Sequence, residues 1–240
     1  RNVTLASALL ALLMAVLVFM FVRDDPSEKG LKSYLDKESS GQKEEKILKS
    51  LGRVFRFSNT WFLTIAPGGI VGAVLTFSGL WGVPFLTEVY HLENATAATL
   101  CSLVMLAWAL SGPIYSLVSE RIQLRRMPYL IGTMISLISW SLVFLIPGWS
   151  LGVLSLLLFL AGFFSGGMIL GFAQGKETLP LSLSGTVSGV INMGVLTGPM
   201  LLQPLVGFLL DSRKPTAHTS MGIAVGFSFE AVSYTHLRAH

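Results

Sequence analysis

Residues 112–126 hold the side chains best suited to reversible ionic contacts, and they lie between two long apolar stretches. A helix-breaking Gly-Pro opens the segment, the pair Glu120-Arg121 follows, and a second pair, Arg125-Arg126, ends it. Guanidinium groups bind carboxylates and carbonyl oxygens strongly, and the carboxyl end of a helix favours cations. We therefore expect Arg125 and Arg126 to bind carbonyls or acids at the end of a neighbouring helix.

The distribution of basic residues offers a second interpretation of these arginines. Lys and Arg number nine in residues 23–60, three in 119–127 and one in 174–186, whereas residues 87–94 contain none. Basic loops stay on the cytoplasmic side of a membrane, so the arginines could serve only to fix topology and touch lipid head groups. This pattern predicts that residues 23–60 are cytoplasmic and that the first span starts outside. Residues 211–220 conflict with it, since they carry two basic residues on the predicted outer side.

The composition is that of a membrane protein. Apolar residues make up 52% of the chain and charged residues 12%, about half the charge of a soluble domain. The charges are clumped, and uncharged apolar runs of about 18 residues or more indicate helices that span a membrane. The predicted spans are residues 3–22, 61–86, 95–118, 127–147, 149–173 and 187–210, with a partial seventh from Met221.

The sequence offers little for catalysis or metal binding. A lone Cys101 excludes disulfides and thiolate clusters within the chain, and the common hydrolase and zinc-protease motifs are absent. No ionisable residue lies in the middle of a predicted span, where proton relays and charged-substrate sites occur. We expect no enzyme activity, no metal, no cofactor and no nucleic-acid partner, and neither a membrane enzyme nor a channel has a positive signal.

The polar segment 23–60 changes character partway along. Its first part reads as a flexible linker, whereas residues 42–57 place apolar side chains at helical spacing. This pattern predicts an amphipathic helix, either lying on the inner membrane surface or forming a solvated linker.

Glycines are frequent in the spans, where small residues let helices pack closely and also let them bend. Static packing suffices to explain most of them. Gly79, Gly82 and Pro84, near the outer end of the span 61–86, predict a gating bend.

Residues 112–126 read Gly-Pro-Ile-Tyr-Ser-Leu-Val-Ser-Glu-Arg-Ile-Gln-Leu-Arg-Arg. This segment resembles the loop motif of the major facilitator superfamily, G-P-x-x-G-x-x-S-D-R-x-x-R-R, with Ser116 in place of Gly and Glu120 in place of Asp. Residues 185–211 also resemble helix eleven of that family. The resemblance implies that the motif latches the cytoplasmic side in the outward-open state and releases it on the inward swing. The implied latch residues are Gly112, Pro113, Ser116, Glu120, Arg121, Arg125 and Arg126.

The same resemblance implies an all-α, polytopic transmembrane helical bundle. Residues 1–22 would be the last helix of the N-terminal half, 23–60 the cytoplasmic central loop, and 61–231 an incomplete C-terminal six-helix half. Residues 232–240 break the apolar pattern and resemble a translated sequencing adaptor, so they are excluded from the functional argument.

Helices seven, eight, ten and eleven of this half face the central cavity in the family, which implies candidate solute contacts. A polar group in a span must find a partner or face a cavity, although hydrogen bonding between helices would also satisfy it. Aromatic side chains could form a cavity wall, but they more often pack or anchor at interfaces. The candidate cavity-lining residues are Phe77, Trp81, Tyr115, Phe164, Asn192 and Gln203.

These features predict a secondary transporter of a small organic solute that works by alternating access. The alternative is a transport-inactive solute sensor of the same fold. We expect a multi-pass protein of the bacterial inner membrane whose partners are the lipid bilayer, the solute, the missing N-terminal half and protons as a coupling ion.

Overall fold

The computed structural model describes residues 2–22 and 47–212 of the 240-residue chain. The chain divides into two compact units, Arg1–Glu45 and Lys46–His240. In the first unit, α1 (Asn2–Phe21) is a single helix whose described side chains are exposed and almost all apolar. A helix that is apolar on every side requires apolar surroundings, and this one is long enough to cross a membrane. The first predicted span is therefore confirmed.

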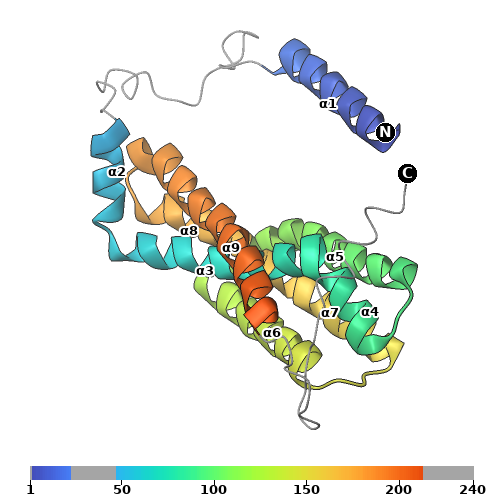
Figure 1. Ribbon diagram of the computed structural model, residues 1–240. Helices are drawn as coiled ribbons and strands as arrows, with labels where there is room; N and C mark the ends of the chain where they lie inside the picture. The colour runs from blue at the N-terminus through green and yellow to red at the C-terminus, as the bar shows by residue number, and fades with distance from the viewer. Residues whose placement is uncertain (1, 23–46, 213–240) are drawn as a thin grey trace. The chain divides into compact units, whose positions relative to one another are not determined.

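The second unit is also helical in its described part (Figure 1). Its elements are α2 (Ile47–Phe55), α3 (Ser58–Thr76), the π-helix η3 (Phe77–Trp81), α4 (Gly82–Tyr90), α5 (Asn94–Ile122), α6 (Arg126–Leu145), α7 (Leu151–Ser165), the 3₁₀ turn η4 (Gly166–Met168), α8 (Ile169–Thr178), the 3₁₀ turn η5 (Leu181–Leu183) and α9 (Ser184–Ser212).

Five stretches of this unit are long and apolar enough to cross a membrane, which with α1 makes six in the described residues. They are Ser58–Tyr90, Asn94–Ile122, Arg126–Leu145, Leu151–Thr178 and Leu181–Leu210. They match the five spans predicted between residues 61 and 210, and most continue beyond the predicted ends into more polar sequence. The partial seventh span predicted from Met221 lies outside the described residues, as do residues 23–46 and 232–240.

The two helices α3 and α9 cross in close contact (Figure 1). Gly68 and Gly72 on α3 meet Gly194 and Gly198 on α9, each pair spaced four residues apart. A Cβ atom at Gly198 would collide with the backbone of Gly68, and one at Gly72 would lie 2.7 Å from Cδ1 of Leu202. Small residues at this spacing let helix backbones approach closely, so packing accounts for these four glycines.

Three buried clusters hold the rest of the described unit together, the smallest of them around Tyr115, Tyr129 and Leu170. The largest one fills the space between α3, α4, α5, α6 and α7, with Leu86, Val104 and Leu158 fully buried in it. The second joins α2 to the start of α9 through Val54 and Ile191.

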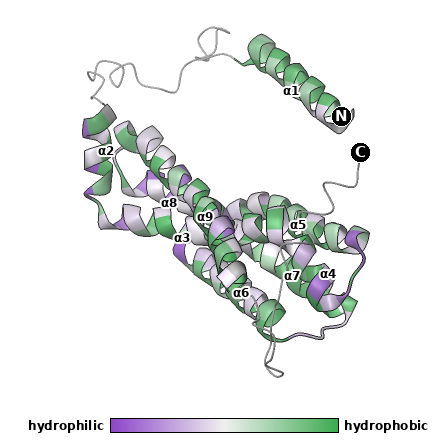
Figure 2. Ribbon diagram, in the orientation of Figure 1, coloured by the Kyte–Doolittle hydropathy of each residue, from purple (hydrophilic) through white to green (hydrophobic). Residues whose placement is uncertain are grey.

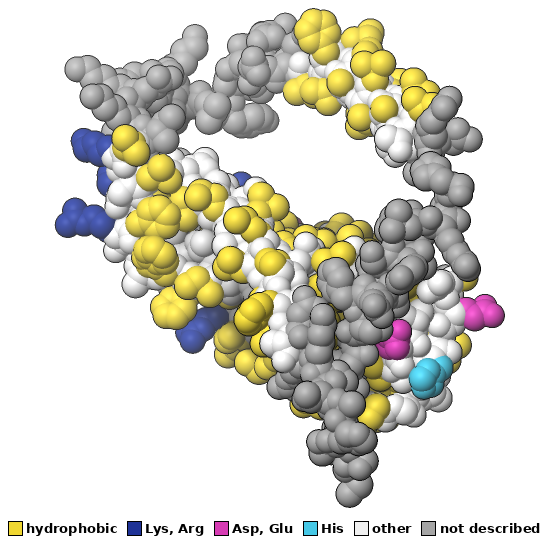
Figure 3. All heavy atoms as spheres, viewed as in Figure 1, with side chains coloured by type: hydrophobic (Ala, Val, Ile, Leu, Met, Phe, Trp, Pro, Cys, Tyr) yellow, Lys and Arg dark blue, Asp and Glu magenta, His cyan; other side chains and the backbone are white. Residues whose placement is uncertain are grey.

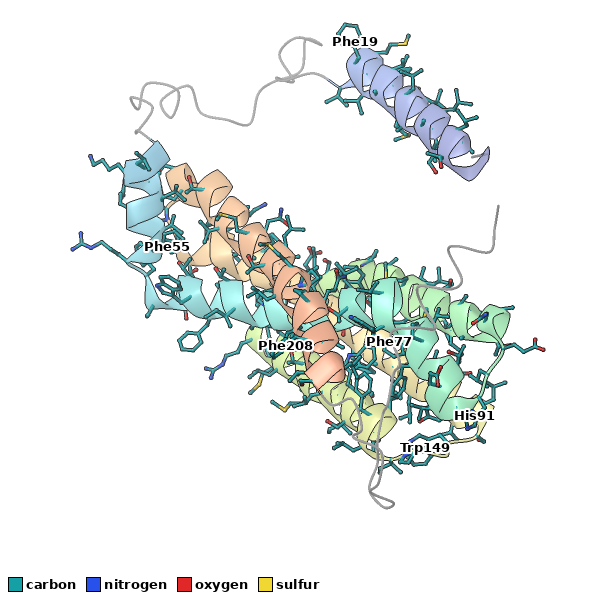
Figure 4. The ribbon with its side chains drawn as sticks, viewed as in Figure 1. Phe19, Phe55, Phe77, His91, Trp149 and Phe208 are labelled. Atoms are coloured by element: carbon teal, nitrogen blue, oxygen red, sulfur yellow. The ribbon has the colours of Figure 1, made fainter. Side chains whose placement is uncertain are left out.

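Many large apolar side chains are exposed along the helices, and Figure 2 colours much of these helices green for hydrophobic residues. Charged side chains gather at the two ends of the second unit (Figure 3). On the face that Figure 3 shows, Lys and Arg side chains lie around the end that carries α2, whereas the visible acidic and His side chains lie at the end that carries α4. Phe55 marks the first end in Figure 4, and His91 and Trp149 mark the second. An apolar belt between two charged ends is the surface expected of a protein embedded in a bilayer.

The expected break at Gly112-Pro113 is absent, because α5 continues through both residues to Ile122. Proline removes one backbone hydrogen bond, and a helix packed among other helices tolerates that loss. As a consequence Glu120 and Arg121 belong to the last turn of α5 rather than to a loop after it.

The amphipathic helix predicted over residues 42–57 is described from Ile47, as α2. Part of its apolar side packs against α9. Val54 is 0% exposed and packs against α9, and Ser50 is buried as well. Helix α2 is therefore docked onto the bundle, since its apolar stripe matches the apolar start of α9, and its place at the inner membrane surface stays a prediction.

Candidate functional site

The turn between α5 and α6 holds the arginine motif in a fixed geometry. Helix α5 ends at Ile122, and the next residue, Gln123, has a φ of 54° in the left-handed region. Its side-chain Nε2 donates to the carbonyl oxygen of Glu120 at 2.6 Å. The buried hydroxyl of Ser119 donates to the carbonyl oxygen of Leu124 at 2.8 Å. The first contact satisfies a carbonyl in the last turn of α5, and the second holds the turn that leads to α6 against that helix.

Arg125 joins this turn to the end of another helix. Its Nη2 lies 3.0 Å from Oε1 of Glu177, in the last turn of α8, and its Nε donates to the same oxygen at 3.1 Å. Its Nη1 donates to the Ser119 hydroxyl at 3.0 Å. The Arg125 side chain is 27% exposed and that of Glu177 is 52% exposed. An ion pair this accessible stabilises by about 0–1 kcal/mol, so it can form and break readily.

The other predicted latch residues do not share this contact. Gly112, Pro113 and Ser116 lie within α5, and Glu120, Arg121 and Arg126 are exposed. Among the described residues, none of those three charged side chains forms an ion pair. The structure thus brings one motif arginine to an acid at the end of a neighbouring helix.

Two residues of this site escaped the sequence reasoning. Ser119 is the hydroxyl that supports Arg125, and Glu177 is the acid that binds it. Glu177 follows Lys176 at the end of a predicted span, on the same predicted side as residues 119–127. That shared side was the available signal, but the fold was needed to show which acid lies within reach.

The predicted gating bend coincides with an irregular stretch of helix. The π-helix Phe77–Trp81 is closed by the Gly82 amide, which donates to the carbonyl oxygen of Phe77, five residues earlier. Pro84 has no amide hydrogen and its ring would clash with the carbonyl of Leu80 in a regular helix, which accounts for the wider turn. A Cβ atom at Gly82 would lie 2.6 Å from both Cys101 Sγ and Phe77 O, whereas one at Gly79 would meet nothing within 4 Å.

An apolar cavity of about 360 Å³ lies beside this π-helix. Two of the predicted cavity residues, Phe77 and Trp81, line it, and so does Thr76, whose buried hydroxyl has no hydrogen-bond partner among the described residues. Phe77 is labelled in Figure 4, where side chains of several helices surround it. The other lining residues are Ala73, Phe85, Phe144, Leu202, Val206 and Leu210.

Gln203 connects the π-helix to α9 instead of opening into the cavity. The indole Nε1 of Trp81 donates to the backbone oxygen of Gln203 at 3.1 Å. The Gln203 side chain donates in turn to the carbonyl oxygen of Leu75 at 3.4 Å. This polar side chain therefore serves contact between helices, which is the alternative that its sequence position left open.

The three remaining candidates lie apart from the cavity. Tyr115 is buried against Gly132 and Gly167, and Phe164 packs in the same cluster. Asn192 is exposed on α9, and its amide has no hydrogen-bond partner among the described residues. The structure therefore does not gather the six predicted residues into one site.

Within the described residues, no group of three His, Cys, Asp or Glu side chains could hold a metal ion.

Comparison with known proteins agrees with the architecture. A family model described as Major Facilitator Superfamily matches residues 1–202. No curated protein matches the chain.

Proposed function

We propose, because the chain belongs to the Major Facilitator Superfamily, that it is the C-terminal half of a secondary transporter moving a small organic solute by alternating access. The family and the six apolar helices make the chain part of an integral, multi-pass membrane transporter. A transport-inactive sensor is not favoured, since the matched family is one of transporters.

The Arg125–Glu177 pair is the observation that carries the proposed mechanism. It ties the turn between α5 and α6 to the last turn of α8. A pair worth at most about 1 kcal/mol shifts a two-state equilibrium by up to about fivefold. Such a contact can favour one conformation without preventing the other. We therefore assign Arg125 and Glu177 the role of a latch that holds in one state and opens in the other.

The exposed amide of Asn192 supports a solute path along α9. An amide that faces lipid without a partner is costly, so Asn192 is expected to face a water-filled path or a polar group of another segment. Phe77 and Trp81 remain proposed solute contacts on the cavity wall. The buried position of Tyr115 and the partly buried position of Phe164 in the same cluster fit packing better than contact with a solute.

The π-helix supports a gating role for Gly79, Gly82 and Pro84. π-Bulges occur frequently at functional sites, because a widened turn can shift the register of the helix around it. We propose that this segment bends as the transporter changes state.

The proposed setting is the bacterial inner membrane, with the polar segment 23–60 in the cytoplasm. Proton coupling would use ionisable residues of the missing half, because none lies in the middle of the predicted spans of this chain.

Exchange measurements on the full-length protein in proteoliposomes test the proposed function. The solutes are radiolabelled organic acids, amino acids, short peptides and sugars, each offered on both sides of the membrane. We expect saturable exchange of one class, with a changed rate in Glu177→Gln and an unchanged rate in the neighbouring control Lys176→Gln. Binding of a solute without any exchange would overturn the transporter proposal and restore the sensor alternative.

A further inference from the structure

The apolar cavity beside the π-helix has one hydroxyl at its wall, that of Thr76. Several threonine hydroxyls elsewhere in the described helices donate to the carbonyl oxygen four residues earlier, as those of Thr64, Thr133 and Thr197 do at 2.7–2.8 Å. The Thr76 hydroxyl makes no such bond and has no other partner among the described residues, although the residue is only 6% exposed. A buried hydroxyl without a partner is costly, so a ligand group that bonds to it would recover that cost.

Three phenyl rings form much of the remaining wall. The ring centroids of Phe77, Phe85 and Phe144 lie 5.2–6.0 Å apart, and each pair meets edge to face at 66–74°. Aromatic rings favour this geometry, and an aromatic ligand placed against them can repeat it. The wall therefore favours an aromatic group over an aliphatic group of the same size.

A fourth ring of the wall, that of Trp81, is held in place by α9. Its Nε1 donates to the carbonyl oxygen of Gln203, and a Cβ atom at Gly207 would lie 3.3 Å from its Cζ2 atom. The indole thus packs against α9 where the absence of a side chain leaves room for it. A wall that is already formed needs little ordering when a ligand binds, which favours affinity.

The volume of the cavity and the lack of charge in its lining limit the ligand further. An apolar cavity of about 150 Å³ is enough to hold benzene, so a cavity of about 360 Å³ has room for two fused rings. None of the nine lining residues, all in the described part of the chain, is ionisable. A charged group would lose its hydration there without gaining a partner, so the group that binds is uncharged.

We propose that this cavity binds an uncharged aromatic group of one or two rings that carries a hydrogen-bonding substituent, such as a hydroxyl or a carbonyl. The substituent bonds to the Thr76 hydroxyl, and the ring lies against Phe77 and Trp81. This assignment rests on the proposed function, because it makes the aromatic group part of the transported solute and so narrows the solute class.

Binding of radiolabelled 2-naphthol and naphthalene tests the site in the full-length protein. The two probes have the same rings, and only 2-naphthol has a hydroxyl. Equilibrium dialysis of the protein in nanodiscs measures binding, and empty nanodiscs correct for partition into lipid. We expect saturable binding of either probe to one site per protein, with 2-naphthol bound about two- to tenfold more tightly than naphthalene.

Variants at Thr76 isolate the contribution of its hydroxyl. Thr76→Val keeps the branched shape and should remove the preference for 2-naphthol, whereas Thr76→Ser keeps a hydroxyl and should retain it. Thr133→Val is the matched control, because the Thr133 hydroxyl already bonds within its own helix, and it should bind both probes as the wild type does. Val206→Phe fills the cavity from α9 and should abolish saturable binding of both probes, which tests the site even if Thr76→Val fails to fold.

Three outcomes would overturn the proposal. The first is no saturable binding in the wild-type protein, which is the result expected if another segment of the chain fills the cavity. The second is equal affinity for the two probes in the wild type, or a preference that survives in Thr76→Val. The third is saturable binding that persists unchanged in Val206→Phe, since the probes would then bind elsewhere.

Solute exchange in proteoliposomes separates failure of this proposal from failure of the proposed function. We expect 2-naphthol to inhibit exchange of the solute in the wild type and not in Val206→Phe. Exchange that 2-naphthol leaves unchanged would contradict the aromatic class and leave transport standing. Saturable binding of 2-naphthol to a protein that exchanges no solute would overturn transport and leave the binding site standing.

Discussion

The guanidinium group of Arg125 lies 3.0 Å from the carboxylate of Glu177, 52 positions later in the chain. The pair connects the turn between α5 and α6 with the last turn of α8, and the buried Ser119 hydroxyl supports the arginine from the other side. Because both side chains are partly exposed, the contact is weak enough to open during a conformational change.

Exchanging the charges of this pair should separate its attraction from other effects. We expect Arg125→Glu and Glu177→Arg each to raise hydrogen exchange in residues 119–126, because each leaves two like charges in contact. The double variant should recover much of the protection, with a coupling of about 0–1 kcal/mol. The amide hydrogen-exchange rates of residues 119–126 in the purified protein measure this coupling. If the changes in the two single variants simply add in the double variant, the two residues are not coupled.

The crossing of α3 and α9 depends on the absence of side chains at Gly194 and Gly198. We expect Gly198→Ala to lower the free energy of unfolding by about 1–3 kcal/mol, because its methyl group would overlap the backbone of Gly68. The control is Gly189→Ala on the same helix, where a Cβ atom meets nothing within 4 Å. That variant should be neutral or slightly stabilising, since Ala favours a helix more than Gly does. Equal losses in both variants would argue against close packing at this crossing.

The thiol of Cys101 reports on the π-helix, because it is buried beside Gly82. We expect Gly82→Ala to disturb this contact and to speed labelling of Cys101 by a maleimide at least several-fold. Gly79→Ala is the control, because a Cβ atom at Gly79 meets nothing within 4 Å, and it should leave the labelling of Cys101 slow. Fast labelling of the wild-type protein under native conditions would show that the segment is not packed as described.

Trp81 ties the π-helix to α9 through one hydrogen bond to Gln203. Replacing it by Phe keeps most of the apolar contact and removes the donor, which should cost about 0.5–1.5 kcal/mol of stability. Trp108→Phe is the matched control, because the half-buried Trp108 indole has no hydrogen-bond acceptor among the described residues. Thermal unfolding in detergent compares the two, and an equal loss in both would assign the effect to ring packing rather than to the hydrogen bond.

The membrane spans were predictable because hydropathy depends on composition over about twenty residues. Local geometry was harder to predict. Pro113 was expected to break a helix, but α5 passes through it because neighbouring helices compensate for one lost hydrogen bond. The docking of α2 onto α9 also depends on a partner surface that its own periodicity does not reveal.

The site was predictable in part. Arg125 was expected to bind an acid at the end of a neighbouring helix, and the structure identifies that acid as Glu177. The candidate cavity residues could not be divided into core residues and cavity-lining residues from the sequence, because both positions favour the same residue types. Only the fold separates Tyr115, which packs on Gly132, from Trp81, which lines the cavity.

Accessibility of a single thiol at position 192 tests the central claim most directly. In the full-length protein carrying Asn192→Cys and Cys101→Ala, an impermeant thiol reagent should label the new cysteine from either side of the membrane, and solute should protect it. Adding Glu177→Gln should raise labelling from the side on which Arg125 lies by up to about fivefold and lower labelling from the other side. A cysteine at the buried position Val190 is the control and should stay unlabelled. Labelling at position 192 from one side only, unaffected by the state of the latch, would contradict alternating access along α9.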